Sequence, residues 1–158
     1  MFREVARTKQ RMTETECIEL LQSERCGVLS VLGDDGYPYG LPIDHWYCAE
    51  NGRLYFHSGK KGHKIDALRR SDKVSYCVYD AGTPDADNWS LHRKSVIVFG
   101  RMHPVEDEAE AMEIVTKLSL QFTDDRNYIE REIEKLRGAT LVFELIPAWI
   151  TGKRVHEA

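Results

Sequence analysis

The stretch RLYFHSGKKGHKIDALRR, residues 53–70, decides how the fold is interpreted. It opens with three residues of high β-propensity, 54–56, and breaks at Ser58 and Gly59. After two lysines and a glycine it continues as a short helix with Ile65 and Leu68 on one side. The first turn of a helix carries unpaired N–H groups and the positive end of the helix dipole, and both attract anions. The stretch therefore predicts an anion site, of a kind that suits phosphate, where a strand leads into a helix.

The chain of 158 residues predicts one domain over residues 1–158, with a flexible lead-in at 1–12 and a polar tail at 152–158. Its net charge of −4 argues against a nucleic-acid partner, which usually selects a basic surface. No apolar run approaches the roughly 20 residues that cross a bilayer, and the charged N-terminus lacks the apolar core of a signal peptide. We expect neither a nucleic-acid nor a membrane partner.

Four cysteines are present, and none forms a C-x-x-C pair. Cys26, Cys48 and Cys77 each lie in strand-like sequence beside apolar residues, so we expect them to be buried free thiols. A chain of this length does not need disulfides for stability. Free thiols suit a reducing compartment, and the cytoplasm is the expected location.

The flanking sequence predicts helices and strands in an order typical of an antiparallel barrel. Thr13 and Glu16 have the spacing of a capping box at the start of a first helix, and Gly100 is expected to form a bulge in a long strand. The expected strands cover residues 26–32, 37–48, 53–57, 73–80, 95–105 and 140–151, and the expected later helices cover 64–70, 107–121 and 124–136. Strands and helices do not alternate, so the pattern predicts a six-stranded antiparallel β-barrel with peripheral helices rather than a parallel sheet.

Residues 37–48, YPYGLPIDHWYC, have the composition of a strand but contain Pro38, Gly40 and Pro42. A proline cannot donate a ladder hydrogen bond, so its position must face away from a partner strand or lie at a bulge. Two interpretations stay open. The irregular backbone could accept a flat ligand, or the segment could be an edge strand protected against aggregation.

Several common sites are excluded by missing motifs. There is no G-x-x-x-x-G-K-[ST], no G-x-G-x-x-G and no G-x-S-x-G, which argues against a P-loop, a dinucleotide fold and a serine hydrolase. No H-x-x-x-H or paired cysteines occur, so we expect no metal site. His45 and His57 fall on neighbouring predicted strands, where histidine is usually hydrogen-bonded.

Four blocks in order carry a resemblance: GDDGYPYGLPIDHWY, GRLYFHSGKKGHKIDALRRSDKVSYCVYD, KSVIVFGRM and ITGK. Together they resemble the FMN-binding split-barrel family related to pyridoxamine phosphate oxidase, and most closely its nitroimidazole-resistance (Nim-type) group. The resemblance implies a homodimer of split β-barrels with FMN at the subunit interface. FAD stays possible, because an exposed phosphate pocket leaves room for an adenylate.

The resemblance also implies site residues. His57 is expected nearest the substrate as the catalytic residue, and Trp149 is either an aromatic wall across the interface or part of the barrel core. The implied cofactor-binding residues are Leu41, Pro42, Ile43, His57, Ser58, Lys61, His63, Lys64, Ser95, Val96 and Trp149. The C-terminal sequence ITGKRVHEA does not match the arginine and histidine motif of the oxidase itself, so oxidation of pyridoxamine phosphate is not expected.

Three functions follow from the resemblance. The first is an FMN-dependent oxidoreductase that reduces a small electron-poor substrate such as a nitroimidazole or another nitroaromatic. The second is a non-catalytic protein that binds or stores flavin. The third is a split barrel that binds haem or a deazaflavin, where His45, His57 or His63 could serve as an axial ligand to haem.

Overall fold

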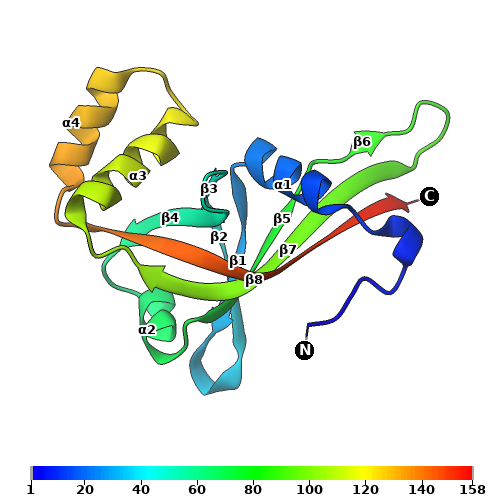
Figure 1. Ribbon diagram of the computed structural model, residues 1–158, viewed down its shortest axis with the longest axis horizontal. Helices are drawn as coiled ribbons and strands as arrows, with labels where there is room; N and C mark the ends of the chain where they lie inside the picture. Colours follow the sequence, from blue (N-terminus) through cyan, green and yellow to red (C-terminus); the bar gives the residue numbers. More distant parts are fainter. Residues whose placement is uncertain (1, 158) are drawn as a thin grey trace.

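The computed structural model describes residues 2–157 and consists of an antiparallel sheet curled into a half-barrel, with helices at its periphery (Figure 1). The strands follow the order β2-β1-β5-β7-β8-β4-β3, and β6 pairs with β7. This confirms the predicted fold class, a split β-barrel. The strands are β1 Cys26–Leu32, β2 Pro38–Asp44, β3 Trp46–Cys48, β4 Arg53–Gly59, β5 Lys73–Tyr79, β6 Thr83–Pro84, β7 Leu91–Pro104 and β8 Thr140–Glu157. The helices are η1 Thr8–Gln10, α1 Glu14–Ser23, η2 Asp34–Gly36, α2 His63–Arg70, α3 Glu108–Leu120 and α4 Arg126–Leu136.

Eight strands are present in the described chain, so the predicted number of six was wrong. The segment 37–48 divides at His45 into β2, which pairs with β1, and β3, which pairs with β4. The predicted loop 81–92 contains β6, which pairs with the start of β7. Strand β2 ends the sheet order, so it is an edge strand in the isolated chain, as one of the two interpretations required.

The C-terminal segment 152–157 is not a tail but the end of β8, which was predicted to stop at Thr151. Strand β7 begins at Leu91 rather than Ser95 and supplies ladder partners as far as Glu157. A polar sequence is compatible with a strand because backbone groups, not side chains, make the ladder. A register shift between Phe99 and Gly100 confirms an irregularity at the predicted place, but the extra residue is Ala148 of β8 rather than Gly100.

The N-terminal lead-in also contacts the sheet. Met12 is buried, and its N–H donates to the carbonyl oxygen of Gly152. Arg11 forms a β-bridge with Lys153. The capping box predicted for Thr13 and Glu16 is confirmed and starts α1.

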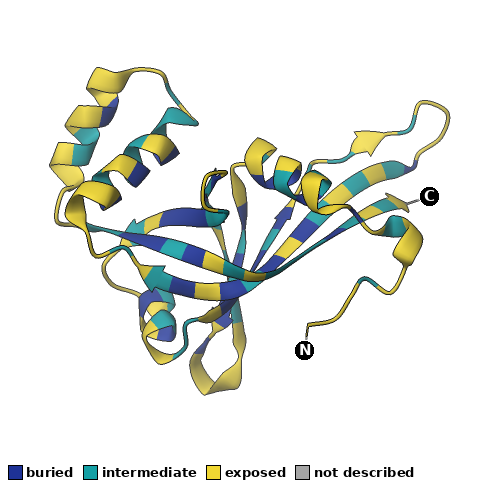
Figure 2. Ribbon diagram, in the orientation of Figure 1, coloured by how far each residue is buried: buried dark blue, intermediate teal, exposed yellow. Residues whose placement is uncertain are grey.

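Buried side chains follow one face of the curled sheet (Figure 2). Alternate residues of β1, β4, β5, β7 and β8 point into this core, and residues of α1 and α2 close its ends. A second cluster lies where α3 packs on the opposite face of β4 and β8. The α3–α4 hairpin therefore covers only one end of the sheet's other face, and Figure 1 shows it at the end opposite the β6–β7 hairpin.

A buried hydrogen-bonded pair joins β5 to the segment between β2 and β3. The Tyr76 hydroxyl lies 2.8 Å from the Ile43 carbonyl oxygen and 2.9 Å from Nδ1 of His45. Nε2 of His45 lies 2.8 Å from the carbonyl oxygen of Leu21 in α1. Both ring nitrogens of His45 are thus engaged, which leaves no nitrogen for haem ligation and argues against this histidine as an axial ligand.

Burial lowers the pKa of His45 below 6.5, mainly by desolvation, against a smaller opposite effect of the Leu21 carbonyl. The unfolded chain then binds a proton more readily than the native protein, so stability is fully present above pH 6.5 and is lost as pH falls. We expect the free energy of unfolding to decrease by up to about 1.4 kcal/mol per pH unit below 6.5. Urea denaturation between pH 7.5 and 5 measures this slope. The variant His45→Gln should reduce it, and an unchanged slope would contradict the assignment.

Three of the four cysteines were expected to be buried. Cys48 is buried and Cys77 is partly buried, but Cys26 is exposed, so that part of the prediction was wrong. Cys26 is the first residue of β1, opposite Asp44 of β2, and the β1–β5 ladder begins only at Val28, so no β5 residue pairs with it. All four cysteines are free thiols. Within residues 2–157, no helix has the length and apolar character to cross a membrane.

Candidate functional site

The start of α2 has the features of an anion site. Its N-cap is Gly62, with φ of 121°, and no side chain caps the helix. Lys64, in the first turn, is partly buried, and this desolvation lowers the pKa of its ammonium group. Within residues 2–157, Lys60, Lys61 and Lys64 form no ion pair. Partly burying an unpaired cation costs free energy, and a bound anion would recover it.

His63 is engaged elsewhere. Its ring stacks on Tyr39 of β2 at 4.1 Å between centroids, and its Nε2 lies 3.5 Å from a carboxylate oxygen of Asp34. Asp34 also accepts from Arg70 at 2.7 Å. The His63 side chain therefore joins α2 to the β1–β2 turn, and its backbone rather than its ring belongs to the helix start.

His57 lies on the face of β4 that α3 and α4 cover. It lines a small cavity of about 100 Å³ with Met112, Val115 and Leu136, among others. Desolvation lowers the pKa of its imidazole, the charge of Asp44 raises it, and that of Lys64 lowers it. His57 thus responds to the charges of both β2 and α2. Ser58, the next residue, projects to the opposite face of β4, and its hydroxyl donates to the Gly59 carbonyl oxygen at 3.1 Å.

The other predicted residues divide between the two faces of the sheet. Leu41 and Ile43 pack against the core, and Val96 is fully buried in it. Their side chains cannot line an exposed site, although their backbone groups can. The remaining three, Pro42, Ser95 and Trp149, alternate with buried neighbours and point outward.

The outward residues of β1, β2, β5, β7 and β8 form a surface that we call the outer face. Its central residues are Val28, Pro42, Cys77, Ile97 and Thr151, which follow one another across the ladder. The sequence predicted these strands as parts of an antiparallel barrel. It did not predict which face would be left without a helix.

Two large cavities lie on the outer face. One of about 500 Å³ is lined by Val28, Pro42 and Tyr79, and one of about 730 Å³ by Ser95, Ile97 and the N-terminal segment 5–7, among others. Ile97 is 37% exposed and Tyr79 is 51% exposed, so this face presents apolar side chains to solvent.

Two polar atoms on the outer face are buried without a partner. Nε1 of Trp149 and Oγ1 of Thr151 have no hydrogen-bond partner within the described chain. The Trp149 ring stacks with Phe2 at 6.2 Å, and Phe2 stacks with Phe99 at 5.3 Å. Buried polar atoms are normally paired, so these two are exceptions within the described chain.

Sequence reasoning thus identified three groups that one chain does not bring into a single pocket. They are the α2 start with Lys61 and Lys64, the exposed His57 beside the α3–α4 hairpin, and the outer face with Pro42, Ser95 and Trp149. Sequence reasoning missed Thr151 and Cys77, because a polar or small residue in a strand carries no signal until its neighbours across the sheet are known.

A curled antiparallel sheet with an unpartnered outer face and a strand–loop–helix anion site defines the class of split-barrel proteins. The chain belongs to the pyridoxamine 5'-phosphate oxidase family, whose model matches residues 13–154. No curated protein sequence matches the chain.

Solved structures with the same fold are distant in sequence. A candidate 5-nitroimidazole antibiotic resistance protein from Bacteroides thetaiotaomicron is 19% identical with a TM-score of 0.78, covering 93% of this chain and 87% of that one. An FAD-binding protein from Mycobacterium smegmatis is 22% identical with a TM-score of 0.68, covering 94% and 99%. An FAD-binding protein from Mesorhizobium loti is 23% identical with a TM-score of 0.65, covering 92% and 97%.

Proposed function

We propose that this protein binds a flavin between two copies of the chain and acts as an oxidoreductase on a small electron-poor compound. The observation that carries the proposal is Lys64, a partly buried cation that has no ion-pair partner among residues 2–157 and lies beside a helix start without a side-chain cap. The names of two structural neighbours, which describe FAD-binding proteins, support a flavin as the ligand.

The residues at the α2 start suit a flavin phosphate. Phosphate is close to a dianion at neutral pH and accepts several hydrogen bonds, preferably from cations and backbone N–H groups. Lys61 and Lys64 would supply the cations, Ser58 would supply a hydroxyl, and the first N–H groups of α2 are available. The phosphate of FMN is sufficient for these donors, and we propose FMN before FAD.

The outer face suits the flavin ring and a second subunit. A flat, partly apolar ring needs apolar surface and a few polar groups at its edge. Edge strand β2 offers the exposed Pro42, and the unpaired Trp149 and Thr151 atoms offer polar contacts. Because the α2 start and the outer face lie apart in one chain, a homodimer would bring one subunit's outer face to the other's phosphate site.

The bound flavin would supply the electron transfer, and the protein would bind and orient it. A reduced nicotinamide is the proposed electron donor. The proposed substrate is a nitroimidazole or another nitroaromatic, in agreement with the name of the Bacteroides neighbour. His57, with its pKa lowered by desolvation, is neutral near pH 7 and would bind the substrate as a hydrogen-bonding group rather than as a cation.

The absorbance spectrum of the purified protein tests the proposal first. We expect flavin absorbance and release of FMN on denaturation, identified by mass, with one flavin per subunit. A colourless protein that shows no saturable binding of added FMN would exclude flavin binding. A Soret band in the spectrum would show that the ligand is haem instead of flavin.

Turnover is tested separately under anaerobic conditions. We expect a reduced nicotinamide to bleach the bound flavin and a nitroimidazole to restore its colour, with the nitro compound consumed. The variant His57→Ala should consume the nitro compound more slowly per bound flavin. If flavin binds but no donor bleaches it, the protein binds flavin without catalysis.

A further inference from the structure

A cluster of three metal-ligating side chains lies at the end of the sheet opposite the α3–α4 hairpin. Asp85 follows β6, His92 lies on β7 and His156 on β8, and one ligand atom from each lies within 4.8 Å of the others. His92 and His156 are direct cross-strand partners. Their rings stack at 4.1 Å between centroids with 13° between planes.

The two imidazoles converge on one oxygen atom. Nε2 of His92 lies 3.4 Å from Oδ2 of Asp85, and Nε2 of His156 lies 3.2 Å from the same oxygen. Two ligand atoms bound tetrahedrally to one zinc ion, at about 2.0–2.2 Å each, are about 3.3–3.6 Å apart. Both imidazole–carboxylate separations match this spacing, but the two rings lie nearly parallel, so one imidazole would have to turn about its side-chain bonds before both nitrogens point at the same ion.

Asp85 is held for this role by its own loop. Its other oxygen, Oδ1, accepts from the N–H of Asp87, and its backbone N–H donates to the Ser90 carbonyl oxygen at 3.0 Å. Oδ2 is left free to face the two histidines.

The surroundings leave room for an ion and a further ligand. The side chains of His92 and His156 are 55% and 48% exposed, so an ion can enter from solvent. The hydroxyl of buried Ser90 lies 2.8 Å from Nε2 of His156 and also contacts Asn88. When a metal occupies the His156 nitrogen, Ser90 can keep its bond to Asn88, so no buried hydroxyl loses its last partner.

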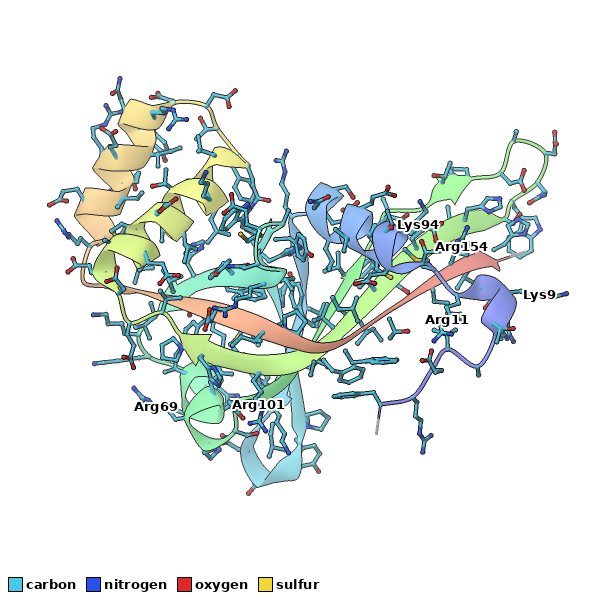
Figure 3. The ribbon with its side chains drawn as sticks, viewed as in Figure 1. Lys9, Arg11, Arg69, Lys94, Arg101 and Arg154 are labelled. Atoms are coloured by element: carbon cyan, nitrogen blue, oxygen red, sulfur yellow. The ribbon has the colours of Figure 1, made fainter. Side chains whose placement is uncertain are left out.

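Nearby positive charge is partly compensated. Lys94 and Arg154 are cross-strand partners two residues from the histidines, and Figure 3 labels both beside α1. Arg154 is held at 2.7 Å by both carboxylate oxygens of Glu16. Lys94 is exposed and can turn its ammonium group away from a bound cation.

We propose that Asp85, His92 and His156 bind one first-row divalent transition metal ion, of which Zn²⁺ is the representative. Two imidazoles and one carboxylate are ligands that such ions prefer, and three protein ligands leave a coordination position open. The ion would join the β6–β7 hairpin to the C-terminal end of β8. The site shares no residue with the proposed flavin site, so it does not depend on that proposal.

Competition between the metal-free, tag-free protein and a coloured chelator for Zn²⁺ tests the site. We expect one equivalent to bind with a dissociation constant of micromolar or below. His92→Ala and His156→Ala should each weaken binding by at least about 100-fold, because each removes one of three ligands. His103→Ala is the matched control, since His103 is an exposed histidine beside the single carboxylate of Asp72 at 3.0 Å, and it should leave binding unchanged.

Thermal melts separate loss of ligands from loss of folding. Zn²⁺ should raise the melting temperature of the wild type and of His103→Ala, but not that of the folded His92→Ala and His156→Ala variants. Wild-type binding no tighter than that of the double histidine variant would overturn the proposal. So would binding that survives in the double variant but disappears in Cys26→Ser, because the exposed thiol of Cys26 would then be the ligand.

Discussion

Lys64→Ala should weaken FMN binding about 10- to 100-fold, with little effect on riboflavin. Loss of a charge-assisted hydrogen bond to phosphate costs about 1.5–3 kcal/mol, which corresponds to this range of affinity. Riboflavin has the same ring but no phosphate, so its binding reports on the rest of the site. Fluorescence titration of the metal-free apoprotein with both ligands measures the two affinities.

The same substitution should not destabilise the apoprotein. Lys64 is partly buried and without an ion-pair partner in the described chain, so its removal relieves a desolvation cost rather than breaking a contact. Unchanged or higher stability of the apoprotein together with weaker FMN binding would show that Lys64 contributes to ligand binding rather than to folding. Lys94→Ala, at the other end of the sheet, is the control and should change neither quantity.

His63→Ala, combined with Lys64→Ala, should weaken FMN binding little beyond the single change. The His63 ring is stacked on Tyr39 and faces Asp34, so its side chain is not free for phosphate. Equal losses of FMN and riboflavin affinity in Lys64→Ala would contradict the phosphate assignment, since they would show that the whole site had changed.

The fold could be predicted further than the site. The strand composition of 26–32 and 73–80, the capping box at Thr13 and the ladder irregularity beside Gly100 are local signals, and the structure has all of them. The extension of β8 beyond Thr151 was not predictable, because its polar residues pair only with a β7 that begins earlier than expected. Pairing between distant strands depends on partners that a local pattern does not contain.

The candidate site shows the same limit. Lys64 was correctly predicted to lie at a helix start. His63 was predicted to have the same phosphate-binding role, but its ring stacks on Tyr39, a contact that the sequence does not reveal. Asp85, His92 and His156 have no motif spacing, and their proximity arises from the pairing of β7 with β8 and from the β6–β7 hairpin. The sequence identified residues with suitable chemistry at single positions, but it did not show which distant residues come together in the fold.

Tyr76→Ala should cost about 3–5 kcal/mol of stability, the range for removing a large buried aromatic side chain. Tyr76 is fully buried, and its ring meets Phe56 edge to face at 5.0 Å. A Cβ added to Gly27 would lie 2.7 Å from the Tyr76 ring, which shows how closely β1 approaches it. Urea denaturation at pH 7.5 measures the loss as a lower midpoint with an unchanged slope.

Tyr76→Phe separates the hydroxyl from the ring. It keeps the packing but removes the hydrogen bonds to Ile43 and His45, and we expect it to cost about 1–3 kcal/mol. Because the hydroxyl links β5 to the end of edge strand β2, the same variant should also weaken FMN binding if that strand lines the flavin. A loss of stability with unchanged FMN affinity would place the flavin away from Ile43, while a loss near zero would show that the hydroxyl does not hold β2. Together, the stability and FMN affinity of the two Tyr76 variants show whether the core contacts of Tyr76 hold β2 in the position that the proposed flavin site requires.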